Sequence, residues 1–345
     1  MNRRRSLGWL WIGLAVLAVI AAPYVLPSYI VSLLTLVFIA ALLAASVDLL
    51  AGQAGLVSIG HAGIAAAAGY GIAWATVNDH GLAVQLGLAL LLTIAVSVVY
   101  GLTTMRTRGI VFLMITLALG MVVFGLAFKL SSVTGGQNGL TNVERPAAIA
   151  VWWQYYFFTA AVFGLALVCL RVIVRSPFGL MLRGVRASES RMSSLGYPVR
   201  AVKFLGVVLS GLFAGLAGVL AVWNSEFISP AAAAFGRSAL AVVMVIVGGT
   251  GTALGPLVGA GVVVGAEHWL SSYVERWPTV LGLVFIVVVL AAPQGIVGGL
   301  YEVRRRVGRR RVRADALAPA SLLDLPPASV PGTPAGPLSE AVEEE

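Results

Sequence analysis

Long apolar stretches alternate with short polar segments along most of this chain. A helix needs about 20 apolar residues to cross the hydrocarbon core of a bilayer. Stretches near that length predict spans at residues 7–26, 29–50, 61–77, 82–104, 110–130, 152–174, 204–223, 238–247, 254–270 and 279–297. The eighth stretch is too short to cross alone and is expected to be part of a broken helix. The pattern therefore predicts an all-α polytopic membrane protein with about ten transmembrane helices (about eight to ten), some of them broken.

The composition supports this class. Of the 345 residues, 59% are hydrophobic and only 11% are charged, whereas a soluble domain carries about 25% charged residues. The net charge of +9 comes mainly from arginines in loops and tails, so we expect no nucleic-acid partner. One cysteine, Cys169, and three scattered histidines provide neither a disulfide framework nor metal-ligand spacing. We therefore expect no metal, no cofactor bound by this chain and no catalytic residues.

The distribution of basic residues predicts the topology. With a cytoplasmic N-terminus, 19 of the 23 Lys and Arg residues fall in cytoplasmic segments. The four on the outer side are Lys129, Arg145, Arg237 and Arg276. Cytoplasmic loops of membrane proteins carry an excess of Lys and Arg. This bias supports an even number of spans with both termini in the cytoplasm.

Three regions follow from this topology. Residues 1–6 are expected to be a cytoplasmic N-terminus, residues 7–300 the transmembrane domain, and residues 301–345 a tail. The tail is basic and then proline-rich, and we expect it to be disordered and cytoplasmic. The transmembrane domain contains two longer polar loops, an external one at about residues 131–151 and a cytoplasmic one at about residues 175–203.

Two glycine-rich segments, residues 52–63 and 247–261, interrupt the apolar pattern. Unwound backbone at membrane depth is tolerated where it is buried in protein or lines a cavity, and transporters use such breaks for binding and gating. Ordinary turns and close helix packing through small residues are the alternative interpretation. The candidate residues for a translocation pathway or gate are Gly52, Gln53, Gly55, Ser58, Gly60, His61, Thr116, Gly248, Gly249 and Gly251.

The cytoplasmic loop reads as two short helices. Ser176 is a suitable N-cap with Pro177 at the first helical position, which predicts a helix through residue 186. Ser188 predicts a second cap, and Gly196 followed by Pro198 ends that helix. A small apolar edge ringed by charge suits a docked partner, and a solvated loop on anionic lipid is the alternative. The candidate docking residues are Arg183, Arg186, Glu189, Arg191, Met192, Leu195 and Gly196.

The chain has no ATPase motif of its own. Its only lysines, Lys129 and Lys203, do not stand in a Walker A sequence, so we expect no ATPase site and no enzymatic activity. Asp48 and Glu267 lie near the ends of apolar spans. So few intramembrane acids argue against an ion- or proton-driven carrier. A secondary carrier and a membrane-embedded enzyme are the less favoured alternatives.

Several blocks together resemble the LivM-type permease subunits of branched-chain amino acid ABC importers. They include Gly-Gln-x-Gly-Leu-x-Ser-Ile-Gly-His-Ala from Gly52, Met-Ile-Thr-Leu-Ala in residues 109–119, Thr-Gly-Gly-x-Asn-Gly-Leu from Thr134, and the loop at 176–203. Gly-Gly-x-Gly-Thr-x-x-Gly-Pro in residues 238–260 and Pro293-Gln-Gly-Ile-Val-Gly complete the resemblance, in family order, over roughly residues 40–300.

The resemblance implies a function and a set of partners. It implies a multi-pass permease of the bacterial plasma (inner) membrane that pairs with a second, LivH-type permease. Two cytoplasmic ATPase subunits that bind ATP and an extracytoplasmic substrate-binding protein would complete the importer, with residues 186–195 as the coupling helix. The implied substrates are branched-chain amino acids. Related permeases import urea, short amides or nucleosides, which are the alternative substrates.

Overall fold

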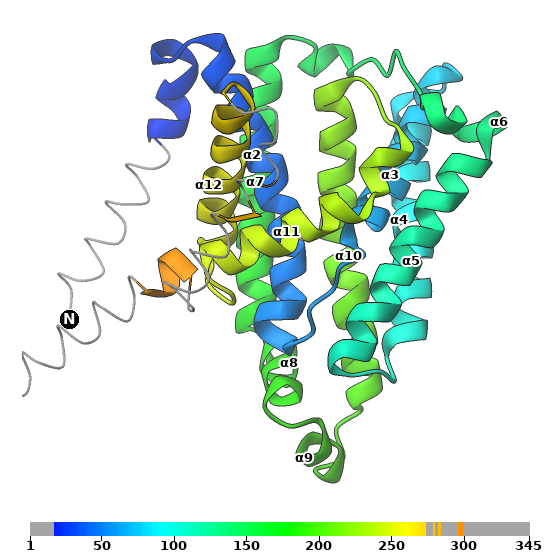
Figure 1. The fold of residues 1–345 in the computed structure, drawn as a ribbon, viewed down its shortest axis with the longest axis vertical. Helices are drawn as coiled ribbons and strands as arrows, with labels where there is room; N and C mark the ends of the chain where they lie inside the picture. The colour runs from blue at the N-terminus through cyan, green and yellow to red at the C-terminus, as the bar shows by residue number, and fades with distance from the viewer. Residues whose placement is uncertain (1–16, 274–278, 280–281, 284–294, 300–345) are drawn as a thin grey trace, which may run out of the picture. The chain divides into compact units, whose positions relative to one another are not determined.

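The computed structural model describes residues 17–273, 279, 282–283 and 295–299 (Figure 1). Within these residues the chain is helical apart from loops and one β-bridge between Leu140 and Ile228. The elements are α2 (Ser28–Asp48), η1 (Leu49–Ala54), α3 (His61–Val77), α4 (Leu82–Thr104), α5 (Gly109–Lys129), α6 (Ser131–Thr134), η2 (Gly136–Asn138), η3 (Ala147–Ile149), α7 (Trp152–Arg175), α8 (Pro177–Ala187), α9 (Glu189–Ser194), α10 (Val199–Ser225), η4 (Pro230–Ala233), α11 (Phe235–Gly248) and α12 (Gly255–Ser271).

The predicted all-α polytopic membrane fold is confirmed. Five helical segments, α2 with η1, α4, α5, α7 and α10, are long and apolar enough to cross a membrane. The bounds of α3 and α4 equal the predicted spans, and α5, α7 and α12 differ from theirs by single residues. Half of the first predicted span, most of the last one and the whole predicted tail at 301–345 lie outside the described residues.

Helices α2 and α10 lie at the centre of the bundle, whereas α4, α5 and α7 expose most of their surface. Small residues in α10 bring its neighbours close. A Cβ atom added to Gly211 or Gly215 would collide with Ser97 or Thr93 of α4. The close helix contact expected from this Gly-x-x-x-Gly pair is therefore present.

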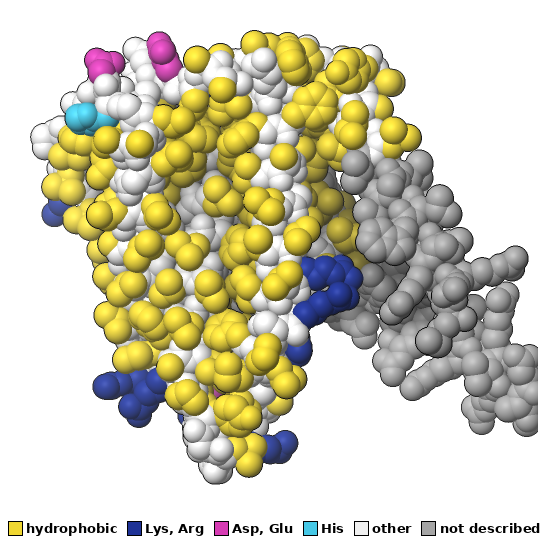
Figure 2. Space-filling model, turned by 180° about the vertical axis from the view of Figure 1, so that it is seen from behind, with side chains coloured by type: hydrophobic (Ala, Val, Ile, Leu, Met, Phe, Trp, Pro, Cys, Tyr) yellow, Lys and Arg dark blue, Asp and Glu magenta, His cyan; other side chains and the backbone are white. Residues whose placement is uncertain are grey.

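The two ends of the bundle differ in charge. Helices α8 and α9 project from one end, which we call the basic end (Figure 1). Figure 2 shows apolar side chains over the middle of one face, Lys and Arg mainly toward the basic end, and Asp, Glu and His side chains at the opposite end. The helix α6 and the loop that follows it lie at that opposite end. An apolar band between polar ends is the surface expected of a chain that spans a bilayer.

The short helix α11 lies across the bundle between its two ends, while α2, α7, α10 and α12 run along it (Figure 1). Fourteen residues are too few to cross a bilayer. Helix α3 is also short, because the chain runs unwound from Gly55 to Gly60 before the helix begins at His61. Both predicted interruptions of the apolar pattern therefore correspond to breaks in the helical backbone.

Candidate coupling and translocation site

The charged loop at the basic end folds as its capping residues predict. The Ser176 hydroxyl accepts a hydrogen bond from the Gly179 backbone N–H at 3.4 Å, and α8 begins at Pro177. The Ser188 hydroxyl accepts from the Arg191 N–H at 3.3 Å and caps α9. Gly196 then adopts the left-handed conformation, with φ of +83°. The two helices are thus set by local sequence, independently of any partner.

Two arginines of α8 attach this helix to η1. Arg186 donates through Nη1 to the carbonyl oxygen of Gly52. Arg183 donates through Nη1 to Gln53 Oε1 at 3.3 Å and to the Val174 carbonyl at 2.9 Å. The bonds to Gln53 and Gly52 join residues 130 and 134 positions apart in the sequence and attach α8 directly to η1.

The segment η1 is in turn joined to the turn between α11 and α12. The Gly251 backbone N–H donates to Asp48 Oδ1 at 2.7 Å. A Cβ atom on Gly52 would lie 2.6 Å from Asp48 Oδ1 and 2.6 Å from Gly251 Cα, so only glycine fits between them. We call the contacts among Asp48, Gly52, Gly251 and Arg186 the glycine junction. It links α8 to α11 and α12 through η1.

Helix α9 is held to the bundle by a mostly buried ion pair. Glu189 Oε1 lies 3.0 Å from Lys203 Nζ, and the Lys203 side chain is only 1% exposed. Lys203 also donates to the Thr107 carbonyl. Glu189 Oε2 lies 2.6 Å from Nε of Arg108, which is largely exposed. The carboxylate therefore connects α9 to α10 and to the loop between α4 and α5.

A buried histidine connects the unwound segment to two long helices. The imidazole of His61 contacts the Ser58 hydroxyl through Nδ1 at 2.9 Å and the Ser210 hydroxyl through Nε2. The Ser210 hydroxyl donates its own hydrogen bond to the Ser46 carbonyl oxygen at 2.8 Å. His61 Nε2 is therefore the donor to Ser210, and Nδ1 accepts a hydrogen bond from the Ser58 hydroxyl. His61 thus serves as a fixed bridge between α2, α3 and α10, with no carboxylate among these partners.

Further bonds fix the rest of this segment. The Ile59 N–H donates to Thr116 Oγ1 of α5 at 3.3 Å, and the Tyr100 hydroxyl of α4 donates to the Gly60 carbonyl at 3.2 Å. The Ala62 N–H donates to the Ser238 hydroxyl of α11 at 3.1 Å. The start of α3 is therefore anchored to the start of α11.

The structure distributes the predicted pathway residues over these two sets of contacts. Gly52, Gln53, Gly55 and Gly251 lie at or beside the glycine junction. Ser58, Gly60, His61 and Thr116 surround the start of α3, and Gly248 and Gly249 lie at the end of α11. Gln53 and Gly251 also line a cavity of about 290 Å³ at the basic end, together with Asp48, Arg171 and Arg175. Their role in translocation stays a prediction.

The predicted docking residues divide into two groups. Arg183, Arg186 and Glu189 make the contacts within the chain described above, while Arg191 and Leu195 lie exposed. Leu195 is 68% exposed, and Met192 packs against Gly184 of α8. The first group thus holds the loop in position, and Arg191, Leu195 and Gly196 are left exposed.

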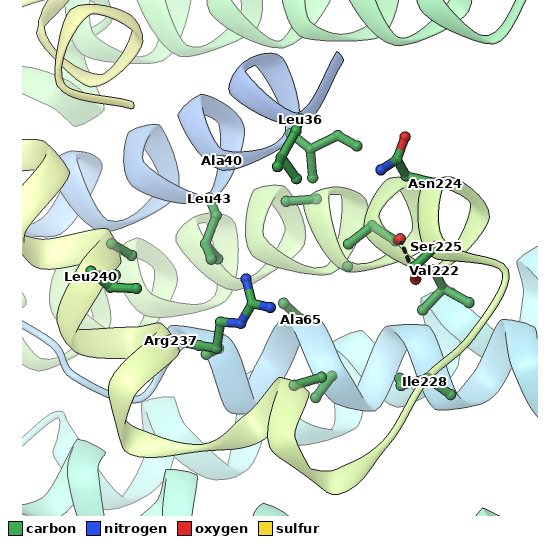
Figure 3. Close-up of a pocket in the computed structure, with 18 of the residues that line it drawn as sticks. Leu36, Ala40, Leu43, Ala65, Val222, Asn224, Ser225, Ile228, Arg237 and Leu240 are labelled. Carbon is green, nitrogen blue, oxygen red and sulfur yellow. Dashed lines mark hydrogen bonds between the residues drawn. The ribbon is translucent and has the colours of Figure 1, made fainter. Parts of the chain in front are cut away.

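A larger cavity of about 310 Å³ lies between α2, α3, α10, α11 and α12 (Figure 3). We call it the central cavity. Most of its wall is apolar, with Leu36, Ala40 and Leu43 from α2 and Ala65 from α3. None of the predicted pathway residues lines it. Arg237 lines it as well. The sequence pattern placed this arginine on the outer side of the membrane, and the structure places it in the first turn of the short helix α11.

The outer wall of the central cavity is braced by the loop at the end opposite to α8 and α9. The Leu140 N–H donates to the Ile228 carbonyl at 2.8 Å, and the Ile228 N–H donates back at 3.0 Å. Arg145 donates to the Trp223 and Asn224 carbonyls and lies 3.3 Å from Glu226. These bonds hold the segment between α10 and η4 that lines the cavity.

Comparisons with known proteins agree with this architecture. The family model described as "Branched-chain amino acid transport system / permease component" matches residues 29–292, from α2 to beyond α12. The "High-affinity branched-chain amino acid transport system permease protein LivM" of Escherichia coli (strain K12) is 27% identical over 315 residues, which cover 83% of this chain and 73% of the relative. The protein of the same name in Salmonella typhimurium is 26% identical over 307 residues, with 80% and 72% covered.

One solved structure shows a weaker similarity. A chain of "PsaBC from Streptococcus pneumoniae in complex with Fab" matches with a TM-score of 0.43 and 16% identity, covering 81% of this chain and 97% of that chain. A similarity of this size does not bear on function.

Proposed function

The chain belongs to the family of permease components of branched-chain amino acid transport systems, and from this membership we propose that it is the transmembrane permease subunit of an ATP-driven importer. In this proposal it forms the pathway together with a second, homologous permease of the LivH type. Two ATPase subunits supply the energy, and an extracytoplasmic binding protein delivers the substrate. The basic end faces the cytoplasm of a bacterial cell, as the excess of Lys and Arg at that end favours.

The observation that carries this proposal is the continuous path of contacts from the charged loop to the broken helices. Arg186 joins α8 to Gly52 of η1, and Asp48 at the end of α2 accepts a hydrogen bond from Gly251 in the turn before α12. A partner that closes on ATP and moves α8 and α9 would therefore shift η1 and the start of α12 together. The chain's own sequence has no Walker A motif, so this motion needs an ATPase from outside the chain.

The proposed substrates are branched-chain amino acids, as the names of the two LivM relatives indicate for those proteins. Urea, short amides and nucleosides are the alternative substrates within this class of importer. The central cavity has mainly apolar walls, with alanine and leucine side chains prominent among them, and this favours a substrate with an aliphatic side chain.

Import into proteoliposomes tests the energy source. The vesicles contain this chain, a LivH-type permease and the two ATPase subunits, with binding protein and radiolabelled leucine on the far side. We expect import only with ATP on the side of the basic end, and we expect it to persist when a protonophore is added. A complex whose ATPase lacks its catalytic carboxylate is the control and should import at background level. Import without ATPase subunits that collapses with the protonophore would show a secondary carrier instead.

A further inference from the structure

The central cavity has features of a binding site that no predicted pathway residue accounts for. Its volume of about 310 Å³ is at the small end of ligand pockets, which run from about 300 to 1,000 Å³. A free amino acid suits that size better than a nucleoside does. Small residues from two helices, Ala65 and Ala66 of α3 and Gly218 of α10, form part of the wall and leave the space open.

One cation faces this apolar space. The side chain of Arg237 extends from the first turn of α11 between Leu43 of α2 and Ala65 of α3 (Figure 3). Among the described residues, none forms a hydrogen bond or an ion pair with its guanidinium. Arg237 is exposed, so its guanidinium is open to the space of the cavity. A guanidinium stays ionised, and an ionisable residue of a membrane protein that faces a water-accessible cavity is a candidate ligand contact. Arg237 therefore offers donors that suit a carboxylate.

Acceptor groups line the same cavity. Glu267 of α12, Asn224 and Ser225 all line it. Among the described residues, Glu267 has no ion-paired cation either. A cavity with one cation, one anion and aliphatic walls has the complementary groups of a zwitterion with an aliphatic side chain.

We propose that the central cavity holds the transported amino acid inside the permease, with its carboxylate on Arg237 and its side chain against the aliphatic walls around Leu43 and Leu240. The ammonium group is received by the acceptor groups of the wall, with Glu267 as the anion. This inference rests on the proposed function and assigns its substrate site. In this proposal the substrate is recognised within the permease as well as by the binding protein.

The test is leucine import by the complete complex in proteoliposomes with Arg237→Gln. Hydrogen bonds to a charged group contribute about 1.5–3 kcal/mol, so we expect import efficiency at low leucine to fall about tenfold or more. Arg237→Lys keeps the positive charge and should retain part of the leucine import. Arg200→Gln, at an exposed arginine of the basic end, is the matched control and should import like the wild type. Complex yield and basal ATP hydrolysis should not change.

A second variant tests the walls. Leu240→Phe narrows the cavity, so leucine import should fall several-fold more than valine import. Unchanged leucine import by Arg237→Gln, or an equal loss in Arg200→Gln, would overturn the assignment of the cavity while leaving the importer function intact. Failure of the wild-type complex to import leucine at all would overturn the proposed function together with this site.

Discussion

Replacing Glu189 with alanine is expected to destabilise the α8–α9 region by about 3 kcal/mol, because it leaves the buried ammonium group of Lys203 without its counterion. Lys203 is 1% exposed and lies 3.0 Å from Glu189 Oε1. The Thr107 carbonyl is its other partner and supplies no full charge. Breaking a buried pair from one side costs more than the pair contributes, since the remaining charge cannot reach water.

Thermal unfolding of the purified complex and protease sensitivity of the loop at 176–198 measure this effect. The melting temperature should fall and cleavage in the loop should rise for Glu189→Ala. Adding Lys203→Met removes the stranded charge, so the double variant should recover much of the loss. Glu226→Ala is the control, because this half-exposed carboxylate lies 3.3 Å from Arg145 in a pair that contributes about 1 kcal/mol or less. Equal losses for Glu189→Ala and Glu226→Ala would show that the pair at Lys203 has no special role.

Replacing Gly52 with alanine is expected to reduce substrate import about tenfold or more while ATPase subunits still bind. The added methyl would lie 2.6 Å from both Asp48 Oδ1 and Gly251 Cα, so these groups must separate. Overpacking of this kind costs about 1–3 kcal/mol. The hydrogen bond from the Gly251 N–H to Asp48 would lengthen or break, and η1 would no longer carry motion to the turn before α12.

Import and ATP hydrolysis measured together distinguish this effect from misfolding. Gly52→Ala should hydrolyse ATP and import little, whereas Gly87→Ala in α4 should import normally. A Cβ atom at Gly87 meets no heavy atom within 4 Å, and alanine favours the helix. Normal import by Gly52→Ala would mean that the glycine junction does not transmit the motion.

Local sequence was sufficient to predict the long apolar helices and the two short helices α8 and α9 of the charged loop. The capping effects of Ser176, Ser188 and Gly196 involve only residues within three or four positions of each. These helix ends can therefore be predicted from the sequence alone. The length of a membrane-spanning helix is set by the thickness of the bilayer, which explains the close agreement for α4. The start of α3 agrees because the glycine-rich segment before His61 breaks the helix there.

The direction of the loop's charged side chains could not be predicted in this way. Arg183, Arg186 and Glu189 are polar residues on a short exposed helix or its flank, a pattern that also fits a docking surface. Their partners, Gln53, Gly52 and Lys203, follow only from the packing of α8 and α9 against η1 and α10. Contacts over such sequence separations depend on tertiary structure.

Arg237 illustrates the same limit. Counted as a basic residue between apolar spans, it supported a topology with an outer loop at that point. The structure instead places it in the first turn of α11, which lies across the bundle, so that the arginine faces the central cavity. Hydropathy reports how apolar a helix is, and it does not report whether the helix crosses the membrane or lies within the bundle.

The central claim is that an ATPase subunit binds this chain at the loop formed by α8 and α9. In a Cys169→Ser background, Leu195→Cys carries a photoreactive label at the exposed tip of the loop, and Val133→Cys carries it at the opposite end. After irradiation of the assembled complex, mass spectrometry identifies the cross-linked chain. We predict a cross-link from position 195 to the ATPase subunit and none from position 133. Efficient labelling at 195 without any cross-link to the ATPase, or a cross-link to it from 133, would contradict the account.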